Sequence, residues 1–172
     1  MVNNAIIRSA RPEDIIKLSI LYQQVYIHTY GKEGVSDEFA NFITVQFSPH
    51  RLEQLIASVS DAIIVAEYKN NLVGVLEIAY DKLCPIDQLT APELNKIYIL
   101  DWFCHQGIGQ QLMNKAETIL REKGYSNVWL WLLESNFRAL NFYQKNGFKQ
   151  IGLAPFKMEV NIYQNIVMAK KL

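Results

Sequence analysis

A glycine-rich junction between two apolar segments is the part of this sequence best suited to chemistry. Residues 96–100 (KIYIL) have the apolar, β-branched character of a strand, residues 104–109 (CHQGIG) follow, and residues 110–120 have apolar positions at helical spacing. Gly107 and Gly109 let main-chain N–H groups approach a ligand closely, and the start of a helix adds the positive end of its dipole. These features favour a binding site for a phosphate or a pyrophosphate.

The glycine spacing alone leaves other interpretations open. A Gly-x-Gly pair before a helix is also typical of tight packing between a strand and a helix. A dinucleotide-binding fingerprint requires Gly or Ala three residues after the second glycine, where this chain has Leu112. The phosphate loop of nucleoside triphosphatases requires Gly-Lys-Ser/Thr, whereas Gly109 is followed by Gln110 and Gln111. Neither of these two nucleotide motifs therefore fits.

A second motif follows the tryptophan-rich segment 127–133. Its spacing over residues 136–148 is Asn-x-x-Ala-x-x-Phe-Tyr-x-Lys-x-Gly-Phe, and Asn136 lies 27 positions after Gly109. Together with the glycine junction, this motif resembles the GCN5-related N-acetyltransferases (GNAT), whose order of elements matches essentially the whole chain. Residues 28–30 (HTY), 93–99 (ELNKIYI) and 166–170 (IVMAK) are similar to the bacterial PaiA-type spermidine/spermine N-acetyltransferases of that family.

The resemblance implies a fold and a reaction. The fold is α/β (α+β), with a mixed, mostly antiparallel central sheet of about six to seven strands flanked by helices. A splayed pair of strands forms the acetyl-CoA cleft. The reaction is direct transfer of acetyl from acetyl-CoA to a primary amine in a ternary complex, and the favoured acceptor is a polyamine such as spermidine or spermine. Other acceptors, namely a protein N-terminus, a lysine or another small amine, and a non-catalytic acyl-CoA-binding module, are the alternatives.

The resemblance also implies which residues bind acetyl-CoA. The pyrophosphate is expected at residues 104–110, and the pantetheine at the main chain of residues 97–99. In the family this motif usually begins with Arg or Gln followed by Gly, whereas this chain has Cys104 and His105. His105 and Gln106 are either substitute phosphate partners or solvated loop residues. The full expected set is Ile97, Tyr98, Ile99, Cys104, His105, Gln106, Gly107, Ile108, Gly109, Gln110, Asn136, Tyr143 and Lys145.

Tyr143 is the expected general acid, because a positioned phenol can protonate the departing CoA thiolate. The alternative is that Tyr143 only packs beside Phe142. Asn136 is expected to hold the pantetheine or to cap the following helix, and Lys145 to reach the CoA phosphates or to act as a cation at the helix C-terminus. Cys104 is not expected to be a nucleophile, because the sequence places no general base beside it and the family transfers acetyl directly.

An amine acceptor arrives protonated, so a carboxylate or a water relay must remove a proton. Glu93, at the start of the splayed strand, is the first candidate base, and Glu77 is the second. The acceptor wall is expected to include His28, Tyr30, Glu33 and Glu77, with Asp37 and Glu38 as further acids for a polyamine. Plain structural roles, such as exposed strand glutamates and a packed aromatic at a helix end, are the alternatives for these residues.

Local signals place these residues on a series of helices and strands. The asparagines at positions 70 and 71 predict a turn at residues 69–71, and prolines predict a loop at residues 81–92, which contains Pro85 and Pro92. Apolar periodicity predicts helices at residues 12–30, 36–45, 49–56, 110–123 and 138–146, and strands at residues 5–8, 62–68, 72–80, 93–100, 127–133, 148–152 and 164–169. The 127–133 strand is apolar on both faces and should be central.

Composition limits the class of protein. The 172 residues are 50% hydrophobic and 20% charged, which predicts a single N-acetyltransferase domain over residues 1–172. Lysine plus arginine and aspartate plus glutamate each total 17, so nucleic acid is not an expected partner. Two cysteines, Cys84 and Cys104, give no metal-site spacing. With no long apolar run, we expect a cytoplasmic enzyme without a membrane partner. The apolar C-terminal strands are compatible with a homodimer or with a monomer's core.

Overall fold

The computed structural model describes residues 5–59 and 62–172, in which the helices and strands follow the predicted order. The elements are β1 (Ile6–Ser9), the 3-10 turn η1 (Pro12–Asp14), α1 (Ile15–Tyr30), α2 (Asp37–Gln46), α3 (Pro49–Ser58), β2 (Ile63–Tyr68), β3 (Asn71–Leu83), β4 (Thr90–Ile99), the 3-10 turn η2 (Asp101–Phe103), α4 (Ile108–Glu122), β5 (Asn127–Leu133), α5 (Phe137–Lys145), β6 (Lys149–Lys157) and β7 (Ile162–Lys171).

These elements divide into two compact units. The first contains the residues up to Ile78 together with Lys96–Ile119, and the second contains Ala79–Asn95 and Leu120–Leu172. Strands β3 and β4 and helix α4 therefore contribute residues to both units. The organisation of residues 1–172 as one domain stays a prediction.

The hydrogen-bonded strands follow the order β1-β2-β3-β4-β5-β7-β6. The pairs β1–β2, β2–β3, β5–β7 and β6–β7 are antiparallel, and β4 pairs with β5 in parallel at Glu93, opposite Trp129. The prediction of a mixed, mostly antiparallel α/β sheet with flanking helices is confirmed. Strand β5 has a partner on each side, as its two apolar faces predicted.

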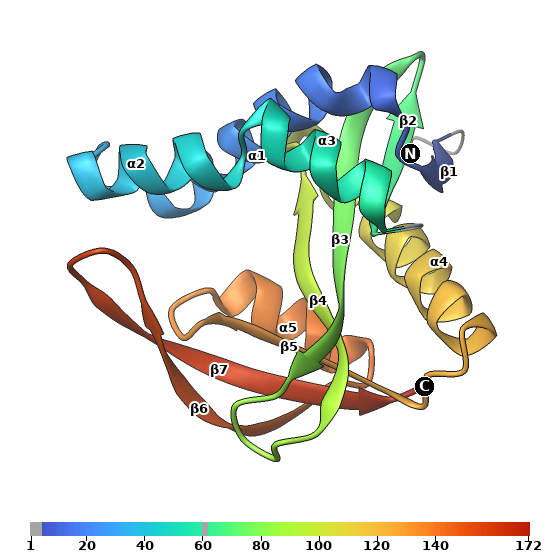
Figure 1. The fold of residues 1–172 in the computed structure, drawn as a ribbon, viewed down its shortest axis with the longest axis vertical. Helices are drawn as coiled ribbons and strands as arrows, with labels where there is room; N and C mark the ends of the chain where they lie inside the picture. The colour runs from blue at the N-terminus through green and yellow to red at the C-terminus, as the bar shows by residue number, and fades with distance from the viewer. Residues whose placement is uncertain (1–4, 60–61) are drawn as a thin grey trace. The chain divides into compact units, whose positions relative to one another are not determined.

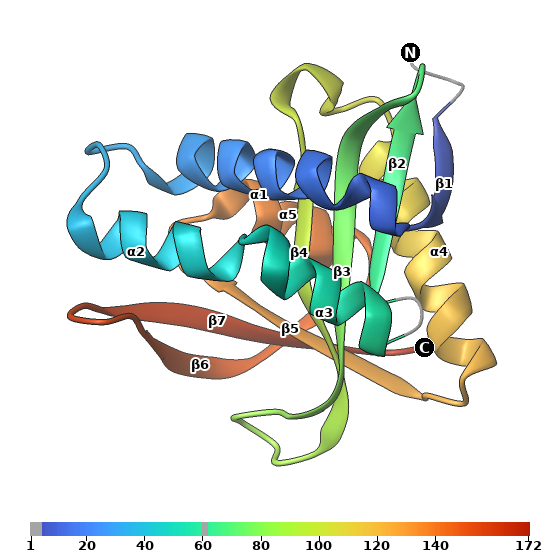
Figure 2. The same ribbon diagram turned by 45° about the horizontal axis from the view of Figure 1, so that its top comes forward.

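Helices α1 and α3 lie across one face of β2 and β3 in the first unit (Figure 2). Leu18 and Tyr22 of α1 and Leu52 of α3 are fully buried, and they belong to one cluster with Val65 of β2 and Val75 of β3. The helix starts are those that the sequence predicts. The hydroxyl oxygens of Ser36 and Ser48 accept hydrogen bonds from main-chain N–H groups three residues later, each at 3.3 Å.

An ion-pair cluster ties β1 to the start of α1 and to β2. The guanidinium of Arg8 lies 2.6 Å from the carboxylate of Asp14 and 2.6 Å from that of Glu67. Burial opposes ionisation of the Asp14 carboxyl. Hydrogen bonds from the side chain of Arg8 and from the N–H of Arg11 outweigh burial, so the pKa of Asp14 falls from 3.8 to about 2. The sequence analysis gave no indication of this cluster.

The second unit is built on the antiparallel pairs of β7 with β5 and β6, which run side by side in Figure 1. Its apolar cluster contains Cys84, Ala91, Trp129, Ala154 and Val167. The indole N–H of Trp129 donates to the carbonyl of Ala91 at 3.3 Å, which fixes the tryptophan against the start of β4. Cys84 and Cys104 are free thiols. In residues 5–59 and 62–172, no helix is long and apolar enough to cross a membrane.

Several predicted boundaries were wrong. Lys69 and Asn70 both have positive φ (49° and 63°), so a two-residue turn joins β2 to β3 instead of residues 69–71. The predicted 81–92 loop is shorter, because β3 runs past Asp81 (φ 52°) to Leu83 and β4 already begins at Thr90. The prediction placed Pro92 in the loop because proline interrupts strands. A strand tolerates proline at a position where no neighbouring strand needs its N–H as a hydrogen-bond donor. Strands β6 and β7 are also longer than predicted, because their exposed residues conceal the pattern.

Candidate active site

The glycine junction lies between η2 and α4 in the first unit. The N–H of Gln111 donates to the carbonyl of Gly107 at 3.1 Å, so Gly107 accepts the first hydrogen bond of the helix. The amides of Ile108 and Gly109, at the start of the helix, have no intrahelical acceptor. They lie at the positive end of the helix dipole, which is the arrangement that binds phosphate groups. The residues present therefore fit a pyrophosphate.

Backbone conformation explains the glycine at position 107. Its φ is +83°, in the left-handed region that glycine occupies without steric cost. A Cβ atom added there would come no closer than 4.0 Å to another side chain, to the amide of Gln111. The requirement for glycine is therefore conformational and does not come from a lack of space. His105 also has positive φ, at 60°, which is uncommon for a residue with a side chain.

Side chains of the same loop are held by its own backbone. The thiol of Cys104 points toward the carbonyls of Leu100 at 3.6 Å and Ile99 at 3.8 Å. The amide of Gln106 donates to the carbonyl of Trp102 at 2.8 Å, which closes the turn before the helix. The amide of Gln110 donates to the side chain of Asn114 at 2.9 Å. These contacts shape the loop.

The C-terminal part of β4 leads into this loop, and Ile97, Tyr98 and Ile99 are half-buried. A Cβ atom at Gly74 of β3 would lie 3.3 Å from the carbonyl of Tyr98, 3.3 Å from the Ile99 side chain and 3.4 Å from Ile108. Gly74 therefore permits close packing of β3 against β4 and against the first residue of α4. The sequence analysis missed this role, although a glycine inside a strand signals close approach.

Glu77, the second predicted base and an expected acceptor residue, lies in a buried charge network. Its side chain is 1% exposed, and its oxygens lie 2.5 Å from Arg51 and 3.4 Å from Lys96. The hydroxyl of Tyr22 also donates to it at 3.0 Å. Burial alone would raise the pKa of Glu77, but the charge of Lys96 and the hydrogen bonds from Arg51 lower it overall. This environment is that of a carboxylate held by two cations, and the expected role of Glu77 as base or acceptor residue stays a prediction.

The other expected acceptor residues of the first unit lie at the end of α1 and just after it. His28 is exposed, with its Nε2 atom 4.0 Å from the carboxylate of Asp101 in η2. Tyr30 is the last residue of α1 and packs against Tyr26, with ring centroids 4.7 Å apart. Glu33 is exposed in the segment that follows. His28 thus points to the turn that precedes the pyrophosphate loop.

The remaining predicted residues belong to the second unit. Glu93 is 7% exposed and lies opposite Trp129, not on an open surface. The side chain of Asn136 accepts a hydrogen bond from the N–H of Ala139 at 3.1 Å and caps α5. Tyr143 is 6% exposed, and its ring packs against Phe142 and Phe148 with centroids 5.5 and 5.7 Å away. Lys145 is exposed at the end of α5.

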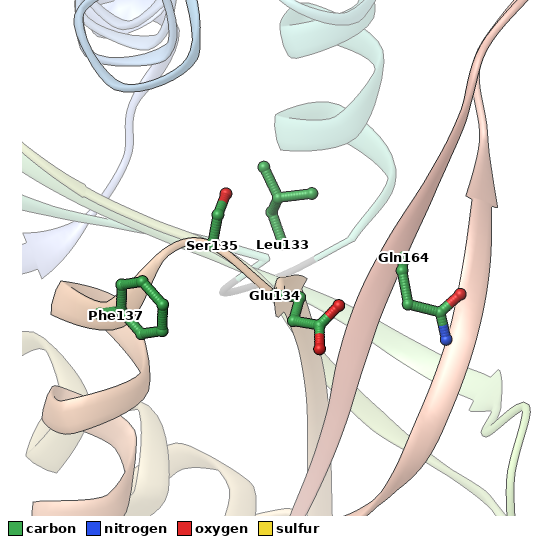
Figure 3. Close-up of a pocket in the computed structure, with 5 residues that line it drawn as sticks. All are labelled: Leu133, Glu134, Ser135, Phe137 and Gln164. Carbon is green, nitrogen blue, oxygen red and sulfur yellow. The ribbon is translucent and has the colours of Figure 1, made fainter.

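A pocket in the second unit was not predicted. It has a volume of about 440 Å³ and is lined by five residues between the end of β5 and β7. Figure 3 shows the Glu134 side chain between Phe137 of α5 and Gln164 of β7, with Leu133 and Ser135 beside them. The only sequence signal was the polar segment between the tryptophan-rich strand and the Asn136 motif. Within residues 5–59 and 62–172, no group of three His, Cys, Asp or Glu residues is arranged to hold a metal.

Comparison with known proteins assigns this arrangement of elements to a family. Residues 32–148 match the model described as the Acetyltransferase (GNAT) family, which is more than half of the 172-residue chain. The chain belongs to this family. As a GNAT protein it is an N-acetyltransferase that uses acetyl-CoA as its co-substrate.

Relatives of this GNAT chain include characterised and uncharacterised enzymes. An uncharacterised N-acetyltransferase of Mycobacterium tuberculosis is 29% identical over 136 residues, covering 79% of this chain and 83% of that protein. The spermidine N(1)-acetyltransferase of Thermoplasma acidophilum is 26% identical over 147 residues, which cover 83% of this chain and 87% of that enzyme. The crystal structure of PaiA N-acetyltransferase from Thermoplasma acidophilum, in complex with coenzyme A, has a TM-score of 0.74 at 21% identity. The match covers 98% of this chain and 99% of the PaiA chain. The last comparison shows the same fold.

Proposed function

We propose that this N-acetyltransferase transfers acetyl from acetyl-CoA to a primary amine of a polyamine. The observation that supports the proposal is the loop before α4, where Gly107 at φ +83° precedes a helix start whose first main-chain N–H groups have no intrahelical acceptor, as an anion site requires. In a GNAT protein this is the place for the CoA pyrophosphate. The two departures from the usual motif, Cys104 and His105, leave those main-chain donors in place.

The pantetheine is proposed to pair with the main chain of residues 97–99. This segment follows the parallel contact of β4 with β5 at Glu93 and ends at the pyrophosphate loop. A main-chain N–H there would stabilise the oxyanion that forms on the thioester carbonyl. Asn136 is proposed to bind pantetheine as well as to cap α5, and Lys145, which is exposed, to reach the CoA phosphates.

In the proposed step, the neutral amine nitrogen attacks the acetyl carbonyl carbon, the C–N bond forms and the C–S bond breaks. Tyr143 gives its proton to the thiolate that leaves, and the phenolate that results takes the remaining extra proton from the new amide nitrogen, directly or through water. Before attack, the acceptor ammonium loses one proton to a base, either directly or through water. Glu93 is our proposed base, since Glu77 is held between two cations. Tyr143 is largely buried, which keeps bulk water away from its ring.

A polyamine is the proposed acceptor because one relative over most of this chain is a spermidine N(1)-acetyltransferase. Acidic side chains also gather after α1, where Glu33 and Asp37 are exposed and Glu38 is half-buried. Such carboxylates favour a substrate with several ammonium groups. His28 and Tyr30 are proposed as the neighbouring wall of the acceptor site.

An acceptor panel with a free-thiol readout tests the proposal. The protein is mixed with acetyl-CoA and with spermidine, spermine, a monoamine or a peptide that has a free N-terminus. We expect thiol release with the two polyamines above the rate with the monoamine. Turnover of the peptide alone would contradict the polyamine acceptor. No heat of binding with acetyl-CoA at about millimolar concentration would contradict the pyrophosphate loop itself.

A further inference from the structure

The pocket at the end of β5 has the lining of a site for an alkylammonium group. Glu134 supplies a carboxylate, Gln164 an amide and Ser135 a hydroxyl, whereas Leu133 and Phe137 are apolar. All five residues are exposed or half-buried, so a solute can reach them, and none of them is a cation. A carboxylate beside an aromatic ring is a favourable environment for an ammonium group on a methylene chain.

The walls of this pocket are fixed by main-chain hydrogen bonds. The N–H of Glu134 donates to the carbonyl of Gln164 at 3.1 Å, which ties the end of β5 to β7. The N–H of Asn136 donates to the carbonyl of Leu133 at 2.8 Å, so the chain turns tightly into α5. Figure 3 shows the carboxylate of Glu134 pointing toward Gln164, with the ring of Phe137 on its other side. The site is therefore held by strand pairing, with no dependence on a mobile loop.

The position of the pocket on α5 relates it to the proposed acid. Phe137 is the first residue of α5 and Tyr143 is six positions later. At the rise of an α-helix this places them about 9 Å apart along the axis. The pocket and Tyr143 therefore lie toward opposite ends of α5, which suits a substrate that carries a second amine.

We propose that this pocket binds the distal ammonium of the polyamine acceptor, with Glu134 as its counter-ion, Gln164 as a hydrogen-bond acceptor and Phe137 beneath the methylene chain. This inference rests on the proposed polyamine acetylation and adds a residue that determines chain length.

The test measures kcat and KM for spermidine, for a series of α,ω-diamines of increasing length and for butylamine. In the wild-type protein, KM should be lower for a diamine long enough to place its second amine in the pocket than for butylamine. Glu134→Gln should raise KM for spermidine and for such a diamine by about tenfold, because a hydrogen bond to a charged group is lost. It should leave kcat and the constants for butylamine within about twofold. Glu122→Gln, at the exposed end of α4 in the same unit, is the matched control.

The outcomes separate this inference from the function on which it rests. A wild-type protein that acetylates no polyamine overturns both. A wild-type protein that acetylates spermidine, with an unchanged KM in Glu134→Gln, overturns the pocket alone. An equal rise in KM for butylamine and spermidine in Glu134→Gln also overturns the pocket, because Glu134 would then act on the fold or on the reacting amine. Thermal unfolding of both variants, with a melting temperature equal to that of the wild type, shows that the change in KM does not come from misfolding.

Discussion

Gly107 and Gly124, which flank α4, provide a matched pair of positions for testing the pyrophosphate loop. Gly107 has φ +83° and Gly124 has φ +85°, so both occupy the left-handed region. A Cβ atom at Gly107 would be 4.0 Å from its nearest neighbour, and one at Gly124 would meet nothing within 4 Å. Replacing either glycine by alanine therefore imposes a conformational cost with no steric clash. Only Gly107 belongs to the proposed binding site.

The cost in stability should be the same at both positions. An L-residue in the left-handed region costs about 1–2 kcal/mol, and the lower entropy of alanine in the unfolded chain offsets about 0.4–1 kcal/mol. We expect each variant to lose about 1 kcal/mol of the free energy of unfolding. In a chain of this size that lowers the melting temperature by about 2–4 °C. Gly107→Ala and Gly124→Ala should therefore be indistinguishable in thermal unfolding.

The effect on acetyl-CoA binding should differ between the two variants. In Gly107→Ala, relief of the strain that the new methyl group introduces turns the adjacent main-chain donors away from the pyrophosphate, and a hydrogen bond to a charged group contributes about 1.5–3 kcal/mol. This variant should raise the Kd of acetyl-CoA by about tenfold or more, whereas Gly124→Ala should leave it within about twofold. Isothermal titration calorimetry measures both. Equal affinities in the two variants, at equal loss of stability, would refute the assignment of the loop.

Three further predictions concern single side chains. Tyr143→Phe keeps the ring contacts with Phe142 and Phe148, so it should lower kcat by about a hundredfold with little change in the Kd of acetyl-CoA; an unchanged kcat would exclude Tyr143 as the acid. Glu77→Gln leaves Arg51 and Lys96, which are half-buried, without their buried anion, so urea unfolding should show a loss of about 3 kcal/mol, against less than about 0.5 kcal/mol for the exposed Glu122→Gln. Asp14 has a lowered pKa, so its stabilisation is complete above its usual 3.8 and is lost as the pH falls to about 2. Unfolding measured across that interval should show a loss of about 2 kcal/mol that Asp14→Asn abolishes.

Local rules predicted the elements well where one residue determines a boundary. The serines at positions 36 and 48 begin α2 and α3, and glycines at 31, 124 and 147 follow the ends of α1, α4 and α5, because capping is a local interaction. Strand lengths were predicted less well. Pairing decides whether exposed polar residues continue a strand, and pairing partners are far apart in the sequence. β6 and β7 are therefore much longer than their apolar segments.

The candidate site was likewise predicted where it depends on local sequence and missed where it depends on long-range contacts. The glycine junction and the Asn136 motif were visible because they are continuous in sequence. Glu77 was predicted as the second candidate base and as an acceptor residue, and the sequence does not reveal that Arg51 and Lys96, 26 and 19 residues away along the chain, both lie against it. The Glu134 pocket was missed because Gln164, its opposite wall, reaches it only through the pairing of β7 with β5. Contacts formed by long-range pairing thus require the fold.

The backbone conformation shows what the departure from the usual motif at positions 104 and 105 costs. The family usually has glycine at the second of these positions, and His105 has φ 60°, a conformation that favours glycine. A residue with a side chain in this region costs about 1–3 kcal/mol. The loop keeps its shape despite that cost, because Gln106 holds the carbonyl of Trp102 and Cys104 points to the carbonyls of β4 and the residue after it. A loop held in this way presents its main-chain donors, so the proposed anion site does not depend on the usual Arg or Gln.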